Sequence, residues 1–341
     1  MKIPMHAGED SYDIILERGC LRRAGELLNT ERKALVVTDD GVPAAYAEAA
    51  AAQCREARVE TLPQGESTKC FDQFHRLLSR MLAFGMNRGD CVIAVGGGVV
   101  GDLAGFAAAC YMRGIDFYNI PTTVLSQVDS SIGGKTAIDL DGIKNIVGAF
   151  HQPKRVLIDP DTLDTLPDRQ IANGLAEAVK MAVCFDPEGF ARLEAGVGRG
   201  RLDEVIAGAL RIKKRVVEED VREHGLRRAL NFGHTLGHGI ESLQGESGLL
   251  HGECVALGML PMCSPEVRER LIPVLEKLGL PTRCGADADR VMAAVTHDKK
   301  AGDGHILAVV CETAGSCRIV PMETAELRER YAAQFGAGRP E

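Results

Sequence analysis

The sequence has no cluster of basic residues. Lys and Arg contribute 40 residues and Asp and Glu contribute 48, so the 341-residue chain has a formal net charge of -8 at pH 7. Nucleic acids and acidic membrane surfaces bind clustered positive charge. We therefore expect neither as a partner, and an anionic substrate must meet individual basic side chains that the fold brings together.

Long hydrophobic runs are also absent. Residues 1–14 lack the apolar stretch of a secretory signal peptide. No later run approaches the roughly 20 apolar residues that a membrane-spanning helix needs. These two absences predict a cytoplasmic protein that has no membrane partner.

The eleven cysteines form no C-x-x-C pair between Cys20 and Cys317. Single, scattered cysteines are typical of reduced thiols in a protein core rather than of a disulfide framework or a cysteine-based zinc site. If the chain binds a metal ion, histidine and carboxylate side chains must hold it.

The chain is long enough for two packed domains, because single cores rarely extend beyond roughly 250–300 residues. In its first half, apolar runs typical of strands buried on both faces alternate with helical patterns. The expected strands are 34–38, 91–95, 116–120 and 156–158. We predict an α/β N-terminal domain with a parallel nucleotide-binding sheet over residues 1–160.

Beyond about Leu166, hydrophobic residues recur mainly with the 3.6-residue period of helices. The clearest segments are 169–183, 203–219 and 266–278. We predict a mainly α-helical C-terminal domain over residues 161–341, which would bind the metal. The last residues, 336–341, have little to bury and should form a frayed tail.

A glycine-rich turn follows the expected strand 91–95. Residues 96–102 read GGGVVGD, which fits G-x-G-x-x-G and leads into an alanine-rich helical pattern. Glycines there let the backbone approach a phosphate, and a helix N-terminus supplies free N–H groups. The pattern favours phosphate or dinucleotide binding over a simple tight turn. The acidic residue that ends a strand about 20 positions later in Rossmann units is missing.

The segment 121–136 follows another expected strand but is crowded with hydroxyl groups, one carboxylate and one lysine. A loop of this composition typically lines a binding site. Its Gly-Gly-Lys-Thr ending is not a P-loop, because Val128 stands where the first glycine is required. Lys144 and Asn145 add a cation and an amide soon afterwards.

Acidic and histidine side chains with metal-binding spacing occur in the second half. Glu177 and Lys180 are three residues apart and share a helix face, a spacing that by itself is typical of a surface salt bridge. His234, His238 and His251 lie within eighteen residues. The i,i+4 spacing of His234 and His238 permits both to bind one metal ion from a single helix face.

Taken together, these motifs resemble the 3-dehydroquinate synthase family of sugar-phosphate cyclases. The resemblance is ordered and nearly full length, and it is carried by residues 96–102, 111–114, 120–123, 127–136, 144–150, 174–180, 230–238 and 250–253. It implies an NAD-binding domain, a helical metal domain and a homodimer.

Carried over by position, the family's metal ligands are Glu177, His234 and His251, and they would bind Zn²⁺ or Co²⁺. His238 would instead face the substrate phosphate. The other groups implied for that phosphate are Lys135, Asn145, Arg113 from the partner subunit, and either Lys299 or Lys300. Several donors of this kind are what a phosphate requires.

The resemblance also implies residues for the rest of the substrate and for NAD. Lys213 and Arg227 would bind a carboxylate with Asn231 nearby, while Asp129 and Lys180 would hold ring hydroxyls. The residues implied for NAD are Asp39, Glu66, Lys69, Gly97, Gly98, Val99, Asp102, Thr122, Thr123, Lys144 and Thr165. The local sequence departs from the family pattern at 142–145, where Ile143 separates Gly142 from Lys144.

The implied reaction converts 3-deoxy-D-arabino-heptulosonate 7-phosphate to 3-dehydroquinate and phosphate. It would proceed by transient oxidation with NAD, phosphate elimination, re-reduction and aldol cyclisation. Three alternatives stay open: another sugar-phosphate cyclase, a metal-dependent polyol dehydrogenase and a non-catalytic NAD-binding regulator. Lys213 and Arg227 argue against cyclases whose substrates lack a carboxylate.

Overall fold

The computed structural model describes residues 1–243, 248–298 and 305–336. The chain divides into two compact units, Met1–Pro167 and Asp168–Glu341. The predicted boundary at 160/161 falls earlier, at the start of the short helix η5 (Pro160–Thr165), which belongs to the first unit.

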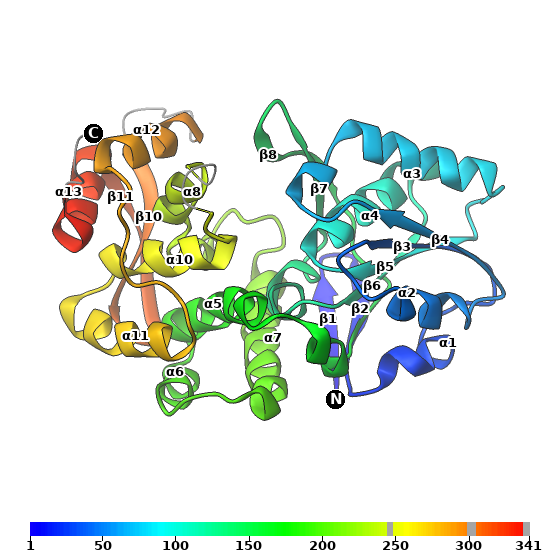
Figure 1. The fold of residues 1–341 in the computed structure, drawn as a ribbon, viewed down its shortest axis with the longest axis horizontal. Helices are drawn as coiled ribbons and strands as arrows, with labels where there is room; N and C mark the ends of the chain where they lie inside the picture. The colour runs from blue at the N-terminus through cyan, green and yellow to red at the C-terminus, as the bar shows by residue number, and fades with distance from the viewer. Residues whose placement is uncertain (244–247, 299–304, 337–341) are drawn as a thin grey trace. The chain divides into compact units, whose positions relative to one another are not determined.

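A seven-stranded sheet forms the centre of the first unit, in the order β1-β2-β9-β6-β5-β3-β4 (Figure 1). Its strands are β1 (Lys2–Ala7), β2 (Asp10–Leu16), β3 (Lys33–Asp39), β4 (Glu56–Leu62), β5 (Cys91–Gly96), β6 (Asp116–Pro121) and β9 (Arg155–Ile158). All neighbours pair in parallel except β1 and β2, which form an antiparallel hairpin at one edge. The prediction of a parallel sheet is confirmed.

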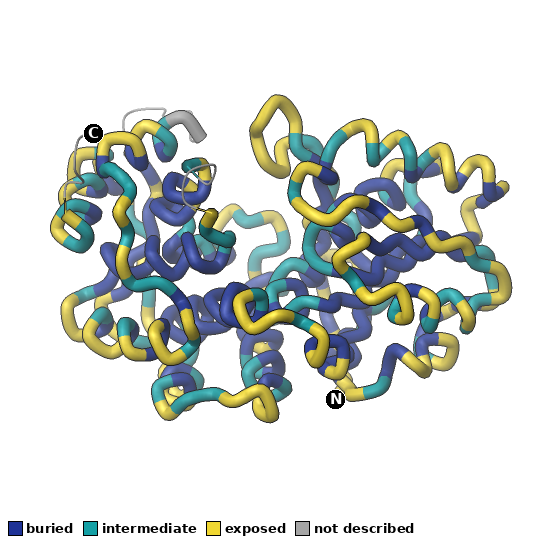
Figure 2. The backbone as a smooth tube through the Cα atoms, in the orientation of Figure 1, coloured by how far each residue is buried: buried dark blue, intermediate teal, exposed yellow. Residues whose placement is uncertain are grey.

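Alternate residues of the central strands enter two different cores. Leu35 and Val37 of β3 pack into one hydrophobic cluster with helices α3 (Phe71–Ala83) and α4 (Gly98–Cys110). Ala34 and Val36 pack into the other with α1 (Ala24–Leu27) and α2 (Ala44–Ala51). This burial on both faces explains why the strands read as continuous apolar runs, and the tube in Figure 2 is dark blue along them.

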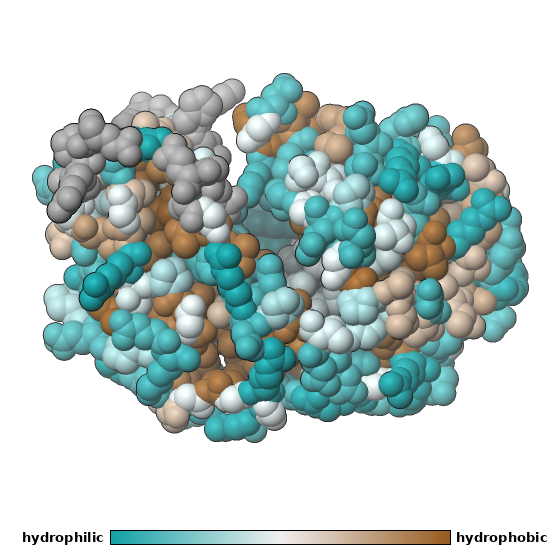
Figure 3. All heavy atoms as spheres, in the orientation of Figure 1, coloured by the Kyte–Doolittle hydropathy of each residue, from teal (hydrophilic) through white to brown (hydrophobic). Residues whose placement is uncertain are grey.

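A second hairpin in the first unit, outside the seven-stranded sheet, joins β7 (Lys135–Leu140) to β8 (Ile143–Phe150). Ile143, Ile146 and Phe150 of β8 are exposed, and brown side chains are visible over this hairpin in Figure 3. Short helices complete the unit: η1 (Cys20–Arg23), η2 (Glu66–Thr68), η3 (Tyr111–Arg113) and the π-helix η4 (Ser126–Ser130).

The second unit is mainly helical. Its elements are α5 (Asp168–Phe185), α6 (Pro187–Glu194), η6 (Arg199–Arg201), α7 (Leu202–Glu219), η7 (Leu226–Asn231), α8 (His234–Glu241), α10 (His251–Met259), η8 (Leu260–Met262), α11 (Pro265–Lys277), α12 (Ala288–Asp298) and α13 (Thr324–Phe335). The predicted helices at 169–183, 203–219 and 266–278 are α5, α7 and α11. Among the described residues, no helix is both long and apolar enough to span a membrane.

Two sequence features set the start of helices in this unit. Asp186 accepts a hydrogen bond from Gly189 N at the start of α6, and Ser264 accepts one from Val267 N at the start of α11. Proline follows each cap at the first helical position, where its missing N–H costs no hydrogen bond. One part of the second half differs from the helical prediction, because β10 (His305–Thr313) and β11 (Ser316–Glu323) form an antiparallel hairpin.

Helix α5 is the central helix of the second unit. Its residues from Ile171 to Cys184 are buried without interruption, and it contacts α6, α7, α10 and β11. A helix covered on all sides has no solvent-facing stripe. The charged residues of this buried stretch, Glu177 and Lys180, are therefore enclosed by protein.

Candidate metal and cofactor sites

Three helices of the second unit bring one carboxylate and two histidines together. The side chains of Glu177 from α5, His234 from the start of α8 and His251 from the start of α10 each offer a donor atom, and these atoms lie within 4.8 Å of one another. Nε2 of His234 is 3.5 Å and Nε2 of His251 is 3.6 Å from Oε1 of Glu177. Two imidazoles and a carboxylate form a donor set suited to zinc with open positions.

Glu177 is the most deeply buried member, with 1 % of its side chain exposed. Neither of its oxygens accepts a hydrogen bond of normal geometry from the described residues, although Nζ of Lys180 makes a close ionic contact with Oε2. Burial favours the neutral acid, but Lys180, His234 and His251 hold the pKa of Glu177 well below its usual range. A buried carboxylate that stays charged needs compensation, and a divalent cation would provide it.

The two histidines carry different charges in the absence of a metal ion. Burial and the nearby Lys180 lower the pKa of His234 far below its usual value. Burial acts in the same direction on His251, but its contacts with Glu177 and Glu241 prevail and raise the pKa to about 9. His234 is therefore neutral, as a metal ligand must be, whereas His251 has to lose a proton when a metal binds.

Close packing of backbones fixes the positions of these helices. A Cβ atom on Gly258 of α10 would lie 2.0 Å from the carbonyl oxygen of Gly233, which precedes α8. A Cβ atom on Gly252 would lie 1.9 Å from the carbonyl oxygen of Asn173 in α5. Only glycine allows approaches this short, so these two glycines determine how closely the helices that carry Glu177, His234 and His251 approach one another.

Replacing Gly252 with alanine should lower the free energy of unfolding by about 1–3 kcal/mol or more, because backbone must move to admit the methyl group. Gly208 in α7 is a matched control, since a Cβ atom there would meet no heavy atom within 4 Å. Gly208→Ala should raise stability by about 0.5–1 kcal/mol. Urea unfolding of both purified variants checks this, and equal stabilities would contradict the packing argument.

His238 lies one turn after His234 on α8 and is exposed. It belongs to a second group of three possible donors, His238, Glu241 and His251. Among the residues that the structure describes, neither group contains both His234 and His238, although their rings are 5.2 Å apart. The i,i+4 spacing alone does not show whether His234 binds a metal ion together with His238 or together with Glu177 and His251.

The predicted substrate cations of the second unit are buried. Lys213 on α7 and Arg227 on η7 have 6 % and 2 % of their surfaces exposed. Nη1 of Arg227 donates to the carbonyl oxygen of Val221, and Nδ2 of Asn231 donates to Oε1 of Glu223. Buried cations require acceptors or anionic ligands. Lys299 and Lys300 lie outside the described residues.

In the first unit, the glycine-rich turn leads directly into α4, as the sequence predicts. Gly97 precedes the helix, and no side chain caps its N-terminus. Gly98 and Val99 begin the helix, and Thr123 lies beside Gly97, with its Cγ2 atom 3.3 Å from where a Cβ atom of Gly97 would be. The backbone N of Thr122 donates to the carbonyl oxygen of Gly96. Uncapped N–H groups at a helix start suit an anion.

Lys69 connects several of the other predicted NAD residues. Its side chain is 3 % exposed, and its Nζ atom lies 2.9 Å from Oδ2 of Asp102 and 3.3 Å from Oε1 of Glu66. It also donates to Oδ1 of Asn145, a residue that the family pattern assigns to the phosphate. Burial, partly offset by Lys69, raises the pKa of Asp102 to about 6.

The remaining predicted residues of the first unit lie at ends of elements or in loops. Asp39 ends β3 and accepts a hydrogen bond from Gly41 N, and Oγ1 of Thr165 lies 3.1 Å from the hydroxyl of Tyr46. Asp129 is in η4. The exposed members are Arg113, Lys135 and Lys144. Arg113 has a positive φ of 70°, which is rare for a residue other than glycine.

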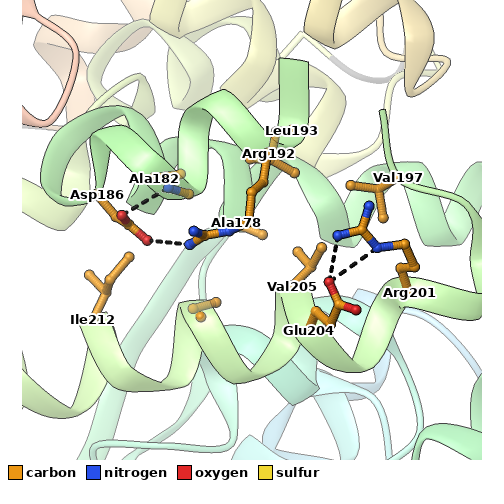
Figure 4. Close-up of a pocket in the computed structure, with 13 residues that line it drawn as sticks. Ala178, Ala182, Asp186, Arg192, Leu193, Val197, Arg201, Glu204, Val205 and Ile212 are labelled. Atoms are coloured by element: carbon orange, nitrogen blue, oxygen red, sulfur yellow. Dashed lines mark hydrogen bonds and ion pairs between the residues drawn. The ribbon is translucent and has the colours of Figure 1, made fainter. Parts of the chain in front are cut away.

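A separate pocket lies between α5, α6 and α7 (Figure 4). Its apolar lining includes Ala178, Ala182 and Ile212, and two ion pairs, Asp186–Arg192 and Glu204–Arg201, border it. It contains none of the predicted site residues. Glu177 and Lys180 of α5 are not among its lining residues.

The sequence interpretation missed two carboxylates beside the site. Glu223 accepts a hydrogen bond from Asn231 and has a positive φ of 61°. Oε2 of Glu241 lies 3.1 Å from Nδ1 of His251. Glu241 could have been found, because it follows His234 by seven residues and His238 by three, which places it on the same helix face.

Known proteins resemble this chain along most of its length. Models of the N-terminal and C-terminal parts of 3-dehydroquinate synthase match residues 59–173 and 174–301. The 3-dehydroquinate synthase of Rhodospirillum rubrum is 45 % identical over 90 % of this chain and 88 % of its own length.

Two solved structures extend the comparison. The 2-epi-5-epi-valiolone synthase of Streptomyces hygroscopicus, solved with NAD+ and Zn2+, is 29 % identical, with a TM-score of 0.87 over 96 % of this chain and 98 % of its own. A 2-deoxy-scyllo-inosose synthase, solved with carbaglucose-6-phosphate, NAD+ and Co2+, shares the fold at 24 % identity, with a TM-score of 0.90 over 98 % of this chain and all of its own. Because both family models match consecutive parts of the chain and a full-length relative is this similar, the chain belongs to the 3-dehydroquinate synthase family.

Proposed function

We propose that the chain is an NAD- and metal-dependent 3-dehydroquinate synthase, a phosphate-eliminating lyase that converts 3-deoxy-D-arabino-heptulosonate 7-phosphate to 3-dehydroquinate and phosphate. The observation that carries this proposal is the group of Glu177, His234 and His251, which lies inside the part of the chain matched by the family's C-terminal model. Two oxygens of Glu177 that lack normal hydrogen bonds support a cation at this group.

The metal would be held by Glu177, His234 and His251. Three nitrogen and oxygen ligands leave positions open for substrate oxygens, as in catalytic zinc sites. Zn²⁺ or Co²⁺ bound there would polarise the substrate oxygen at which NAD transiently oxidises the sugar. The valiolone synthase named above, which was solved with NAD+ and Zn2+, supports the same pair of cofactors for this chain.

The N-terminus of α4 would bind the NAD pyrophosphate. Gly97, Gly98 and Val99 offer backbone N–H groups that no side chain caps, and the helix dipole favours an anion at this end. The other residues proposed for NAD are Asp39, Glu66, Lys69, Asp102, Thr122, Thr123, Lys144 and Thr165. Asp39 or Glu66 would supply the ribose contact, and Glu66 is already paired with Lys69.

The buried cations of the second unit would bind and orient the substrate. Lys213 and Arg227 suit its carboxylate, with Asn231 nearby, because a buried cation gains most from a charged partner. Lys180 is held against Glu177, where it could donate to a ring hydroxyl beside the metal, with Asp129 accepting from another. A substrate without a carboxylate would leave the buried charges of Lys213 and Arg227 without an anionic partner, so it should bind less well.

The phosphate would be bound by His238, Lys135, Asn145, one of Lys299 and Lys300, and Arg113 of the partner subunit. This last role requires the proposed homodimer. Donors arranged around the phosphate stabilise its charge as it leaves, and the departing phosphate can itself accept the proton from the neighbouring carbon. The protein then contributes mainly positioning and electrostatic stabilisation. We also propose a cytoplasmic location.

The test is release of inorganic phosphate from 3-deoxy-D-arabino-heptulosonate 7-phosphate by the purified chain with NAD and Zn²⁺. Sedoheptulose 7-phosphate and glucose 6-phosphate serve as comparison substrates that lack the carboxylate. We expect phosphate and 3-dehydroquinate from the first substrate only, and no reaction after chelation of the metal. Faster turnover of either comparison substrate would assign the chain to another cyclase activity.

A further inference from the structure

The imidazole of His251 lies between two carboxylates. Its Nε2 atom is 3.6 Å from Oε1 of Glu177, and its Nδ1 atom is 3.1 Å from Oε2 of Glu241. The Glu241 side chain is only 8 % exposed. Glu177 belongs to the proposed metal site, whereas Glu241 is not one of its three ligands.

A carboxylate can only accept a hydrogen bond, so the nitrogen that faces Glu241 carries the proton. Nδ1 of His251 therefore donates to Glu241. In the neutral imidazole the lone pair is then on Nε2, which faces Glu177. We propose that Glu241 is a positioning residue that fixes the tautomer and ring orientation of His251 for metal binding, an inference that rests on the proposed metal site.

The backbone of His251 is already anchored by other contacts. Leu250 N donates to Oε2 of Glu253, and Gly252 N donates to Oδ1 of Asn173. These bonds hold the residues on both sides of His251 but do not act on its ring. Glu177 and Glu241 contact the ring nitrogens, and of these two carboxylates Glu241 is the one outside the proposed ligand set.

Helix α8 gives Glu241 a fixed relation to the rest of the site. The helix begins at His234 and ends at Glu241, two turns later on the same face. One helix thus provides a proposed ligand and the carboxylate that orients a second ligand on α10. The backbone contact between Gly233 and Gly258 holds the two helices in this register.

A different role for Glu241 is possible on geometry alone, because His238, Glu241 and His251 form a second group of potential ligands. In that arrangement Glu241 would bind a metal directly. The orientation of His251 favours positioning, since Nε2 faces Glu177 and the group of proposed ligands, which leaves Nδ1 to keep its proton and donate to Glu241. The two roles predict different metal stoichiometries.

The experiment measures Zn²⁺ affinity of the metal-free full chain by competition with a chromophoric chelator. Carboxylates that orient a ligating histidine typically contribute 10- to 100-fold to metal affinity. Glu241→Ala should weaken Zn²⁺ binding by about this factor while the variant still binds one Zn²⁺ per chain at saturation. Glu241→Gln should weaken it by only about three- to tenfold, because the amide oxygen still accepts from Nδ1 but carries no charge.

Two further measurements separate positioning from a general effect on the fold. Glu194→Ala is the control, since that carboxylate belongs to the same unit and pairs with Arg270; its Zn²⁺ affinity should equal that of the wild type. Thermal unfolding of the metal-free variants shows whether Glu241→Ala folds. If it does not, Glu241→Gln decides the matter, and wild-type affinity in that variant overturns the inference.

The outcomes distinguish this inference from the proposed function. A wild-type chain that binds no Zn²⁺ would overturn both. A wild-type chain that binds Zn²⁺, together with unchanged affinity in Glu241→Ala, would overturn only the role of Glu241. Two Zn²⁺ per wild-type chain and one in Glu241→Ala would also overturn positioning, because Glu241 would then be a ligand.

Discussion

Replacing His234 with alanine should remove the metal ion and abolish turnover, whereas His238→Ala should leave about one Zn²⁺ per chain. The two histidines are one turn apart on α8, with ring centroids 5.2 Å apart. Of these two histidines, only His234 belongs to the group of potential ligands that contains Glu177. Three nitrogen and oxygen ligands already complete the protein's share of an open catalytic zinc site, and a fourth would occupy a position that substrate oxygens need.

The His238→Ala variant should instead lose activity through the phosphate. A hydrogen bond to a charged group is worth about 1.5–3 kcal/mol, so binding and elimination of the phosphorylated substrate should weaken roughly ten- to a hundredfold. Zinc content by elemental analysis and phosphate release are measured on both purified variants. Equal loss of metal from the two would restore the chelating pair that helix spacing also permits, and would remove the proposed phosphate role of His238.

The second large effect concerns NAD, which should be needed only in trace amounts. The proposed reaction returns to the substrate the hydride that was removed from it, so the coenzyme is regenerated in every turnover. Phosphate released should exceed NAD added many times over, and the near-ultraviolet absorbance of NADH should not build up. Both are followed in one assay with NAD far below the substrate concentration.

A metal-dependent polyol dehydrogenase would give the opposite result, namely one NADH for each product molecule and no phosphate. The control is Glu177→Gln, which replaces the one carboxylate of the proposed metal site with a neutral amide. This variant should release no phosphate even when NAD is present. Stoichiometric NADH from the wild type would replace the cyclase proposal with the dehydrogenase. A chain that turned over no candidate substrate would favour the non-catalytic alternative.

Much of the fold follows from local sequence patterns. The runs at 34–38, 91–95 and 116–120 are mainly apolar because β3, β5 and β6 are buried on both faces. Apolar runs without alternation are enough to predict a parallel sheet. Helices α5, α7 and α11 follow in the same way from the 3.6-residue period. The hairpin of β10 and β11 was missed, since its burial pattern is irregular, with exposed and buried positions out of strict alternation.

The sequence by itself determined which chemical groups the chain could use: a glycine-rich turn before a helix, histidines and a carboxylate rather than cysteines for a metal, and isolated cations for an anionic substrate. Spacing alone could not choose between His234 with His238 and His234 with His251, because residues one turn apart share a helix face whatever lies opposite; the choice of His251 came from the resemblance to the family. Tertiary structure decided which donors meet. Glycines at 252 and 258 let α5, α8 and α10 approach until Glu177 faces two imidazoles, and the same packing places Glu241 against His251. These are contacts between different helices, and such contacts leave no periodic signal for a local pattern to detect.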